Sequence, residues 1–298
     1  MTPPHDTADE IRRALAARFE ADRLLGAAVL PIRRPQSDRG PAPRPPAAAA
    51  SSAPAAVQRP PRDRPVRPGP PHRPADATPP RGPVRVATTD DPAVLAERRR
   101  ALQTLDESQV KGCRKCGLCA TRTQTVFGQG SPVARIVFVG EAPGFEEDRT
   151  GLAFVGRAGE LLTDMIQKGM GLRRDDVYIC NVLKCRPPDN RTPAADEIAA
   201  CSPYLWEQLQ TISPEVIVAL GAPAAQTLLN TREPIGRLRG RFHDFYPSGS
   251  PMIGQSIAVM PTYHPAYLLR SPQEKSKAWE DLKQVMTRLG LPLPRRRA

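Results

Sequence analysis

Aromatic residues are scarce in this sequence, and long apolar runs are absent. Only 5% of the 298 residues are Phe, Trp or Tyr. No apolar run approaches the roughly 20 residues that a membrane-spanning helix needs. The segment Met1 to Glu10 lacks the basic stretch and apolar core that mark a signal peptide. We therefore expect a cytoplasmic protein with no membrane partner.

Acidic residues are too few to balance the basic ones. The chain has 43 Lys and Arg against 31 Asp and Glu, which gives a formal net charge of +12. This excess favours an anionic partner, most often nucleic acid, although charge alone does not decide between DNA, RNA and a membrane surface. The six cysteines, in a reducing compartment, indicate metal ligands or core thiols rather than disulfides.

Composition divides the chain into segments. Residues 31–90 hold 17 prolines, 11 arginines, four aspartates and no aromatic residue, and so contribute +7 of the net charge. Proline removes backbone donors and little here can be buried, so we expect a disordered, partly polyproline linker. It is equally compatible with loose phosphate binding and with a plain tether. Residues 1–30 are expected to form a helical segment, 91–292 the main domain and 293–298 a basic tail.

The main domain alternates short apolar runs with helical patterns. Strands are predicted at residues 135–140, 177–182, 216–220 and 257–260, and helices at residues 93–107, 158–168, 194–210, 223–229 and 273–289. This alternation predicts an α/β fold, a three-layer α/β/α sandwich around a central four-stranded, mainly parallel sheet. Ligands of such sheets bind beyond the carboxyl ends of the strands, where this chain has polar loops.

Four cysteines are spaced as a metal-binding set. Cys113 and Cys116 form a C-x2-C pair, while Cys185 and Cys201 come from two distant elements. Four thiolates suit a tetrahedral zinc ion or a cubane iron–sulfur cluster, and the spacing does not decide between them. Cys119 is an alternative to Cys116. The sixth cysteine falls inside a predicted strand and is expected to be a buried thiol.

Polar and aromatic residues follow the first predicted strand. The run from Gly140 to Gly144 reads GEAPG, and Glu146, Glu147 and Asp148 come next. A carboxylate at a strand's mouth can activate water or stabilise a cation, although an exposed acidic turn is the simpler interpretation. Phe154 lies between two glycines, where it is either a stacking platform for a base or an ordinary core residue.

Further candidates follow the second and fourth predicted strands. Asn181 offers an amide donor and acceptor to a base edge, or caps the strand. His264, one of only four histidines, follows the fourth strand and is a candidate catalytic residue. Leu268 and Leu269 come shortly after it. We expect both leucines to be exposed and able to wedge into a duplex.

Together these motifs resemble the family 4 uracil-DNA glycosylases, the iron–sulfur branch of that superfamily. The matching stretches are GEAPG with the following EED, GLAFVGRAGELL, YICNVLKCRPPDNR, LRG at residues 238–240, HPAYLLR and the cysteine set. The resemblance spans about residues 100–290. It implies a monomeric DNA repair enzyme of the bacterial cytoplasm and nucleoid, which releases uracil from single- or double-stranded uracil-containing DNA.

The resemblance also implies a [4Fe–4S] cluster and the residues that hold it. The expected ligands are Cys113, Cys116, Cys185 and Cys201. The chain departs from the family pattern at Cys180, where Thr is common, and at Ala153, where Pro is common. We expect little effect from the first departure and a slightly looser stacking loop from the second.

Roles for the pocket residues follow from the same resemblance. Phe154 would stack on the flipped uracil and Asn181 would read its Watson–Crick edge. His264 would donate to the uracil O2 atom. Glu141 would position water or stabilise the sugar cation. The remaining implied residues support or line the site, or fill the gap in the duplex: Glu147, Asn190, Gly140, Ala142 and Leu268.

Two other functions compete with this interpretation. A branch of the superfamily traps uracil-DNA covalently through a histidine, but the corresponding stretch from Lys184 to Arg191 contains no histidine. We therefore expect catalytic turnover rather than covalent capture of the DNA. The second alternative is a non-catalytic nucleic-acid-binding module with iron–sulfur or zinc, in which the acidic loop is only a turn.

Overall fold

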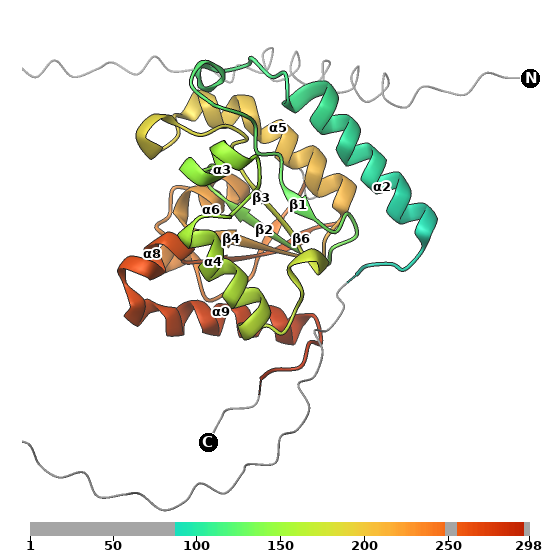
Figure 1. Ribbon diagram of the computed structural model, residues 1–298. Coiled ribbons are helices and arrows are strands. Elements are labelled where there is room, and N and C mark those ends of the chain that lie inside the picture. Colours follow the sequence, from blue (N-terminus) through green and yellow to red (C-terminus); the bar gives the residue numbers. More distant parts are fainter. Residues whose placement is uncertain (1–86, 248–254, 295–298) are drawn as a thin grey trace, which may run out of the picture. The chain divides into compact units, whose positions relative to one another are not determined.

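The computed structural model describes residues 87–247 and 255–294, and a six-stranded sheet forms the centre of this part (Figure 1). The strand order is β1-β3-β2-β4-β6-β5. The four central strands run parallel, and the two edge strands are antiparallel to their neighbours. The strands are β1 (Gln129–Gly130), β2 (Ile136–Gly140), β3 (Tyr178–Asn181), β4 (Val216–Leu220), β5 (His243–Phe245) and β6 (Ile257–Thr262).

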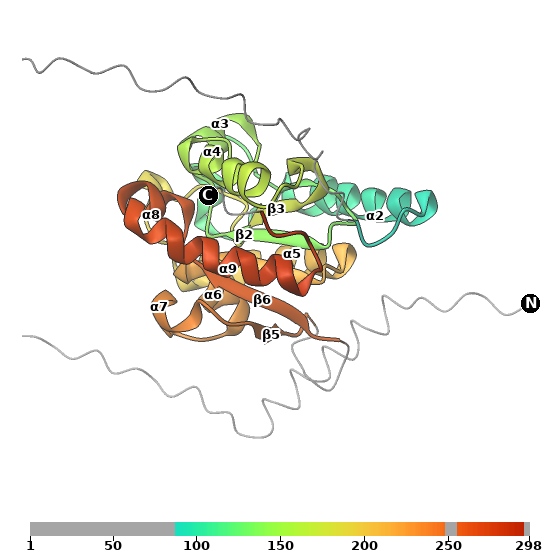
Figure 2. The same cartoon turned by 90° about the horizontal axis from the view of Figure 1, so that it is seen from below.

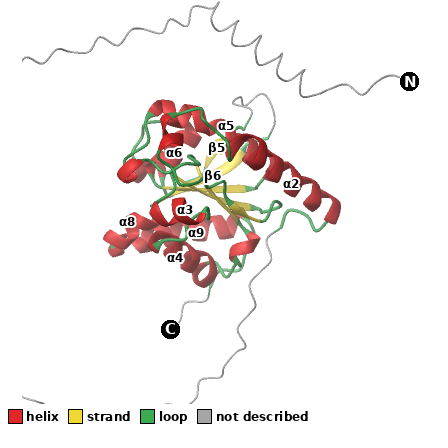
Figure 3. Ribbon diagram, turned by 45° about the horizontal axis from the view of Figure 1, so that its top comes forward, coloured by secondary structure: helices red, strands yellow, loops and turns green. Residues whose placement is uncertain are grey.

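Helices cover both faces of the sheet (Figure 3). The α-helices are α2 (Pro92–Leu105), α3 (Phe145–Thr150), α4 (Arg157–Asp164), α5 (Ala195–Ile212), α6 (Ala222–Leu229), α7 (Ile235–Leu238), α8 (Pro265–Arg270) and α9 (Lys275–Arg288). Short 3-10 or π turns occupy Asp106–Val110, Gly117–Ala120, Met165–Gly169, Arg174–Asp176, Pro188–Asn190 and Pro272–Glu274. Figure 2 shows α9 running alongside β6, with β5 at the sheet edge.

The central strands are buried on both faces, which explains their continuous apolar sequences. Side chains alternate between two cores. Val137 and Val139 of β2 belong to the core with α2, α5 and α6, whereas Ile136 and Phe138 belong to the core with α4 and α9. The sheet is therefore the rigid middle layer, and its strand ends are fixed points from which loop residues project.

The predicted α/β sandwich is confirmed, with a wider sheet than expected. The four predicted strands are the four parallel ones, each within two residues of its expected ends. The sequence analysis missed β1 and β5, because two- and three-residue strands carry too little periodicity to be recognised. It also missed the short helices α3, α7 and α8. Predicted helices 93–107 and 158–168 each end in a π turn rather than continuing as α-helix.

The expected domain boundary at residue 91 is too late. Ala87 forms a β-bridge with Ala134, and the Thr88 N–H donates to the Val133 carbonyl over 2.8 Å. Residues 87–90 therefore belong to the domain, although their composition is that of the linker. The helical segment expected at residues 1–30, the rest of the linker and residues 295–298 of the tail lie outside the described residues.

None of the helices in the two described ranges is long and apolar enough to cross a membrane.

Candidate active site and thiol cavity

A pocket of about 470 Å³ lies at the carboxyl ends of β2, β3 and β6. Its volume is within the range of small-molecule sites in proteins. Loops from segments more than 100 residues apart in the sequence meet here, because parallel strands end at the same edge of the sheet. Seven of the predicted site residues line this pocket: Glu141, Ala142, Glu147, Phe154, Asn181, Asn190 and His264.

The floor of the pocket is made by three residues in close contact. Gly140 pairs with Asn181 across β2 and β3. A Cβ atom at Gly140 would lie 2.3 Å from Asn181 Oδ1 and 2.5 Å from Phe154 Cζ, so only glycine fits. Asn181 Oδ1 is buried and has no hydrogen-bond partner among the described residues. A buried acceptor without a partner is costly, and it indicates a site prepared for a donor on a ligand.

Phe154 is held in a strained backbone conformation beside the pocket. Its φ of 54° is in the left-handed region, which non-glycine residues rarely adopt. The Arg174 guanidinium donates to the carbonyls of Ala153 and Phe154 over 2.8 and 2.9 Å. A Cβ at Gly159 would come within 1.9 Å of the Phe154 oxygen. These contacts fix the ring, whose centroid lies 5.7 Å from that of His264.

Glu147 clamps two loops of the pocket. One carboxylate oxygen accepts the N–H of Gly144 over 3.1 Å, and the other accepts those of Val155 and Gly156 over 2.9 and 3.0 Å. Three backbone donors on one carboxylate hold the GEAPG loop against the Phe154 loop. The geometry therefore gives Glu147 a positioning role.

His264 is a neutral hydrogen-bond donor. It caps the N-terminus of α8, and its Nδ1 accepts the Ala266 N–H over 3.1 Å. Burial lowers the pKa of His264 from 6.5 to about 4, with Arg270 acting in the same direction and Glu147 opposing. The neutral ring then carries its proton on Nε2, as its Nδ1 is an acceptor. Gly221 (φ 89°) lies directly against the imidazole and fixes its position.

Glu141 and Asn190 complete the predicted set. Burial raises the pKa of the Glu141 carboxyl above its ordinary value. Asn190 is in the left-handed region with φ 53°, and its Oδ1 accepts a hydrogen bond from Arg186 Nε over 2.9 Å. Both residues therefore present polar groups at the pocket from loops with defined conformations.

The expectation that Leu268 is exposed is wrong. Leu268 is only 1% exposed because α8 begins at Pro265, and the helix then turns this side chain into the protein. Leu269, one position later, is 37% exposed. In this conformation Leu268 is a packing residue and Leu269 is the leucine of α8 that faces solvent.

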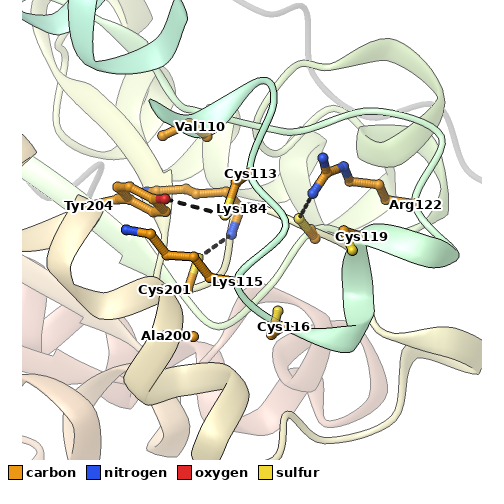
Figure 4. Close-up of a pocket in the computed structure, with 11 residues that line it drawn as sticks. Val110, Cys113, Lys115, Cys116, Cys119, Arg122, Lys184, Ala200, Cys201 and Tyr204 are labelled. Carbon is orange, nitrogen blue, oxygen red and sulfur yellow. Dashed lines mark hydrogen bonds between the residues drawn. The ribbon is translucent and has the colours of Figure 1, made fainter. Parts of the chain in front are cut away.

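The four predicted cysteine ligands come together around a second cavity (Figure 4). Cys113 and Cys116 lie on the loop after α2, Cys185 follows β3, and Cys201 is on α5. Cys119 also lines this cavity. The remaining thiol is buried in β3 and packs in the core, as expected.

Hydrogen-bond donors surround the sulfur atoms of the cavity. Tyr204 donates its hydroxyl to Cys113 Sγ over 3.2 Å, and Arg122 donates to Cys185 Sγ over 3.1 Å. The Lys184 N–H donates to Cys201 Sγ over 3.2 Å. Donors of this kind stabilise thiolates and are typical of metal-bound cysteines.

The donor set of this cavity suits a metal centre. Cys113, Cys116, Cys185 and Cys201 line the same cavity. Four thiolates can bind a single zinc ion, or a cluster of several metal atoms that are each bound by one thiolate. The residues present therefore fit the iron–sulfur cluster that the motifs lead us to expect.

Lys184 connects the two sites. Its side chain is buried, and Nζ donates to the Asn181 carbonyl over 2.8 Å and to Gln208 Oε1 over 2.5 Å. Both acceptors are neutral, so a buried ammonium here needs negative charge close by. The nearby thiolates of Cys185 and Cys201 would supply that charge when metal-bound.

The sequence analysis missed Arg122, Arg174, Lys184 and Tyr204. Their partners are mostly distant in the sequence: Arg174 bonds a carbonyl 21 residues away, and Tyr204 a thiol 91 residues away. Only Lys184 gave a usable signal, because a lysine between a buried strand and a predicted ligand is unusual.

Known proteins are similar to this chain over the region that contains the pocket. The family model of the uracil DNA glycosylase superfamily matches residues 127–283, more than half of the chain. A type-4 uracil-DNA glycosylase of Thermotoga maritima is 48% identical over 174 residues, which cover 58% of this chain and 86% of the relative. A type-4 enzyme of Archaeoglobus fulgidus is 44% identical over 190 residues, covering 62% and 92%. The chain belongs to the type-4 uracil-DNA glycosylases.

Membership of this family confirms the resemblance drawn from the motifs. A type-5 uracil-DNA glycosylase of Pyrobaculum aerophilum is also similar, at 32% identity over 149 residues, 45% of this chain and 62% of the relative. The superfamily match begins at residue 127, after Cys113 and Cys116. The matched region thus contains every pocket residue and two of the four predicted ligands.

Proposed function

We propose that this type-4 family member extrudes uracil from DNA and hydrolyses its N-glycosidic bond, releasing free uracil and leaving an abasic site. The observation that carries the proposal is the unpartnered amide oxygen of Asn181, buried in the pocket beside the Phe154 ring. The uracil N3–H is a donor that would satisfy this oxygen, and the Asn181 amide group would donate to O4. Cytosine has no N3–H, so the same contact discriminates against it.

Phe154 would stack on the extruded base. An enzyme that acts on a base must take it out of the helix, at a cost of a few kcal/mol. Stacking on an aromatic ring returns about 1–3 kcal/mol of that cost. Arg174 holds the backbone carbonyl of Phe154, so little additional ordering of this loop is needed when the base enters.

His264 and Glu141 would act on the charges that develop during cleavage. The departing base becomes anionic and the sugar cationic, and groups that match these charges stabilise the transition state selectively. The Nε2–H of neutral His264 would donate to the uracil O2 atom. A donor of this kind is typically worth about 3 kcal/mol. Glu141 would position the attacking water or stabilise the sugar cation.

The other pocket residues would hold this arrangement. Glu147 ties together the two loops that carry Glu141 and Phe154, and Asn190 supports the opposite wall. Gly140 and Ala142 leave room for the base. All of these residues come from one chain, so we propose a monomer as the functional unit on single- or double-stranded uracil-containing DNA.

We further propose that Cys113, Cys116, Cys185 and Cys201 hold a [4Fe–4S] cluster. When bound, the cluster would tie the loop after α2 to α5 and to the segment after β3. The donors from Tyr204, Arg122 and Lys184 would hold the sulfur atoms in place. Every step of the chemistry above is carried by the pocket residues.

Release of free uracil tests the proposed function. The full-length holoprotein is incubated with an oligonucleotide that carries one uracil, and with the same oligonucleotide carrying thymine. We expect free uracil and alkali-labile abasic sites from the first substrate only. A denaturant-stable protein–DNA adduct without free uracil would show covalent trapping instead, and binding without either product would show a non-catalytic module.

A further inference from the structure

Large apolar side chains are exposed at only a few positions of the described residues, and three of these are within three residues of a pocket residue in the sequence. Phe145 is 59% exposed, Leu152 50% and Leu269 37%. Phe145 follows the pocket residue Gly144, Leu152 precedes the Phe154 loop, and Leu269 lies on α8. Leu293 is 48% exposed but follows α9, away from the pocket. Exposed apolar groups gathered around one opening indicate a contact surface.

Phe145 has the most exposed ring and an ordered cationic partner. The Arg186 guanidinium lies 5.2 Å from the ring centroid. Arg186 Nε is itself held by Asn190 Oδ1, which belongs to the pocket wall. A cation over one part of the ring fixes the orientation of both groups. Phe145 and Arg186 therefore form a pair at the rim of the pocket. Phe145 is next in sequence to the pocket residue Gly144, and Arg186 is next to the pocket residue Pro187.

Arginine side chains line the pocket beside this rim. Arg270 and Arg191 are both lining residues, and Arg191 is also ion-paired with Glu197. A strand that delivers one nucleotide into the pocket must pass its phosphates and its adjacent bases over this rim. Exposed aromatic rings beside arginines are the surfaces on which proteins stack unpaired bases.

We propose that Phe145, supported by Arg186, is a second stacking platform that holds the base adjacent to the extruded uracil on the same strand. The proposal rests on the proposed function, because it requires uracil to enter the pocket. It adds a contact outside the pocket and makes the enzyme sensitive to the nucleotide beside the uracil. The contact favours single-stranded or locally opened DNA, in which that base is free to leave its own stack.

Removal of the adjacent base tests the contact directly. The host is the full-length holoprotein with His264→Ala, which keeps the substrate intact during binding measurements. Three uracil oligonucleotides are compared: one with all bases, one with an abasic spacer 5′ of the uracil and one with the spacer 3′ of it. We expect one spacer to weaken binding by about tenfold, as for loss of one stacked base.

The protein variants then assign that loss to Phe145. Phe145→Ala should weaken binding to the complete oligonucleotide by about the same factor. In this variant the spacer should cause no further loss of affinity. Phe145→Trp should restore the spacer effect. Leu293→Ala, the matched exposed position away from the pocket, should behave like the host. Visible absorbance of each preparation checks that the cofactor content is equal.

Two outcomes would overturn the proposal. If the spacer costs as much affinity in Phe145→Ala as in the host, the adjacent base stacks elsewhere. If Phe145→Ala weakens binding by the same factor with and without each spacer, the ring makes only a general contact with DNA. Failure of the proposed function is separate, since it is seen as absence of uracil release by the unmodified protein.

Discussion

The base pocket is built from strand ends, whereas the thiol cavity is built from a loop, a segment after β3 and a long helix. In the pocket, each side chain is positioned by backbone contacts such as those of Glu147 and Arg174. In the cavity, donors from Tyr204, Arg122 and Lys184 contact the sulfur atoms themselves. The pocket is thus held through backbone groups, whereas the contacts of the cavity converge on the thiols that the proposed cluster would join.

The largest effect is expected from breaking the cavity. Cys201→Ser should prevent cluster binding and remove negative charge from the surroundings of buried Lys184, which would keep only the more distant influence of Asp106. An unpaired buried charge costs about 3–5 kcal/mol, which lowers the melting temperature by about 10 °C in a domain of this size. The measurements are visible absorbance and thermal unfolding. Cys180→Ala is the matched control, since that thiol is buried but does not line the cavity, and it should keep the absorbance.

Breaking the pocket should affect chemistry and leave stability nearly unchanged. His264→Ala removes the donor to the uracil oxygen, and single-turnover uracil release should fall by about 10²–10³-fold. DNA affinity and the melting temperature should change little, because the hydrogen bond that the imidazole makes within the described residues is the capping bond to Ala266. An unchanged single-turnover rate would contradict the role proposed for His264.

The two leucines of α8 should respond in opposite ways. Leu268→Ala empties a buried position and should destabilise the protein by about 2–5 kcal/mol. Leu269→Ala should change stability by less than about 0.5 kcal/mol and should lower activity on duplex DNA more than on single strands. Denaturant titration and release assays on both substrates separate the effects. A stable Leu268→Ala protein would mean that Leu268 is not packed as described.

A smaller effect is expected from pH. His264, with its pKa lowered to about 4, stays neutral as the pH falls through its ordinary value of 6.5. Glu141 has a raised pKa, so it takes up a proton before exposed glutamates do. Activity should therefore show no break near pH 6.5 and should decline at lower pH as Glu141 is protonated. Glu141→Gln should abolish this acidic limb of the single-turnover profile. A limb centred near pH 6.5 that disappears in His264→Ala would reverse the assignment.

The smallest effect should come from deletion of residues 1–86. None of the residues proposed for the pocket or for the cluster lies in this segment, and Ala87, just after it, forms a bridge with Ala134. The single-turnover rate of uracil release should be unchanged. Deletion to residue 90 should be less well tolerated, because it removes the Thr88 bonds to Val133. Inactivity of a folded 87–298 protein would show that the removed segment takes part in catalysis.

Sequence reasoning located the pocket because its main residues follow strands that are easily recognised. Glu141, Asn181 and His264 each lie at or just after the end of a buried apolar strand, and parallel strands end together. The cysteines were found by spacing and by the family resemblance. The short edge strands β1 and β5 were not found, because two or three residues show no period.

The orientation of single side chains was harder to predict. Leu268 was expected at the surface because HPAYLLR follows a strand end, but the start of α8 at Pro265 decides which leucine turns inward. Arg174 acts through bonds to two backbone carbonyls, which leave no pattern in the sequence. Packing in three dimensions, and not local propensity, determines these positions.

The five residues from Asn181 to Cys185 extend from the pocket floor to the thiol cavity. Lys184 bonds the Asn181 carbonyl at one end and Cys201 Sγ at the other. Adding or removing a single residue within this stretch would displace the Asn181 amide in the pocket and the Cys185 thiol in the cavity at the same time. A substitution can alter the pocket or the cavity alone. A change in the number of residues between Asn181 and Cys185 would alter both.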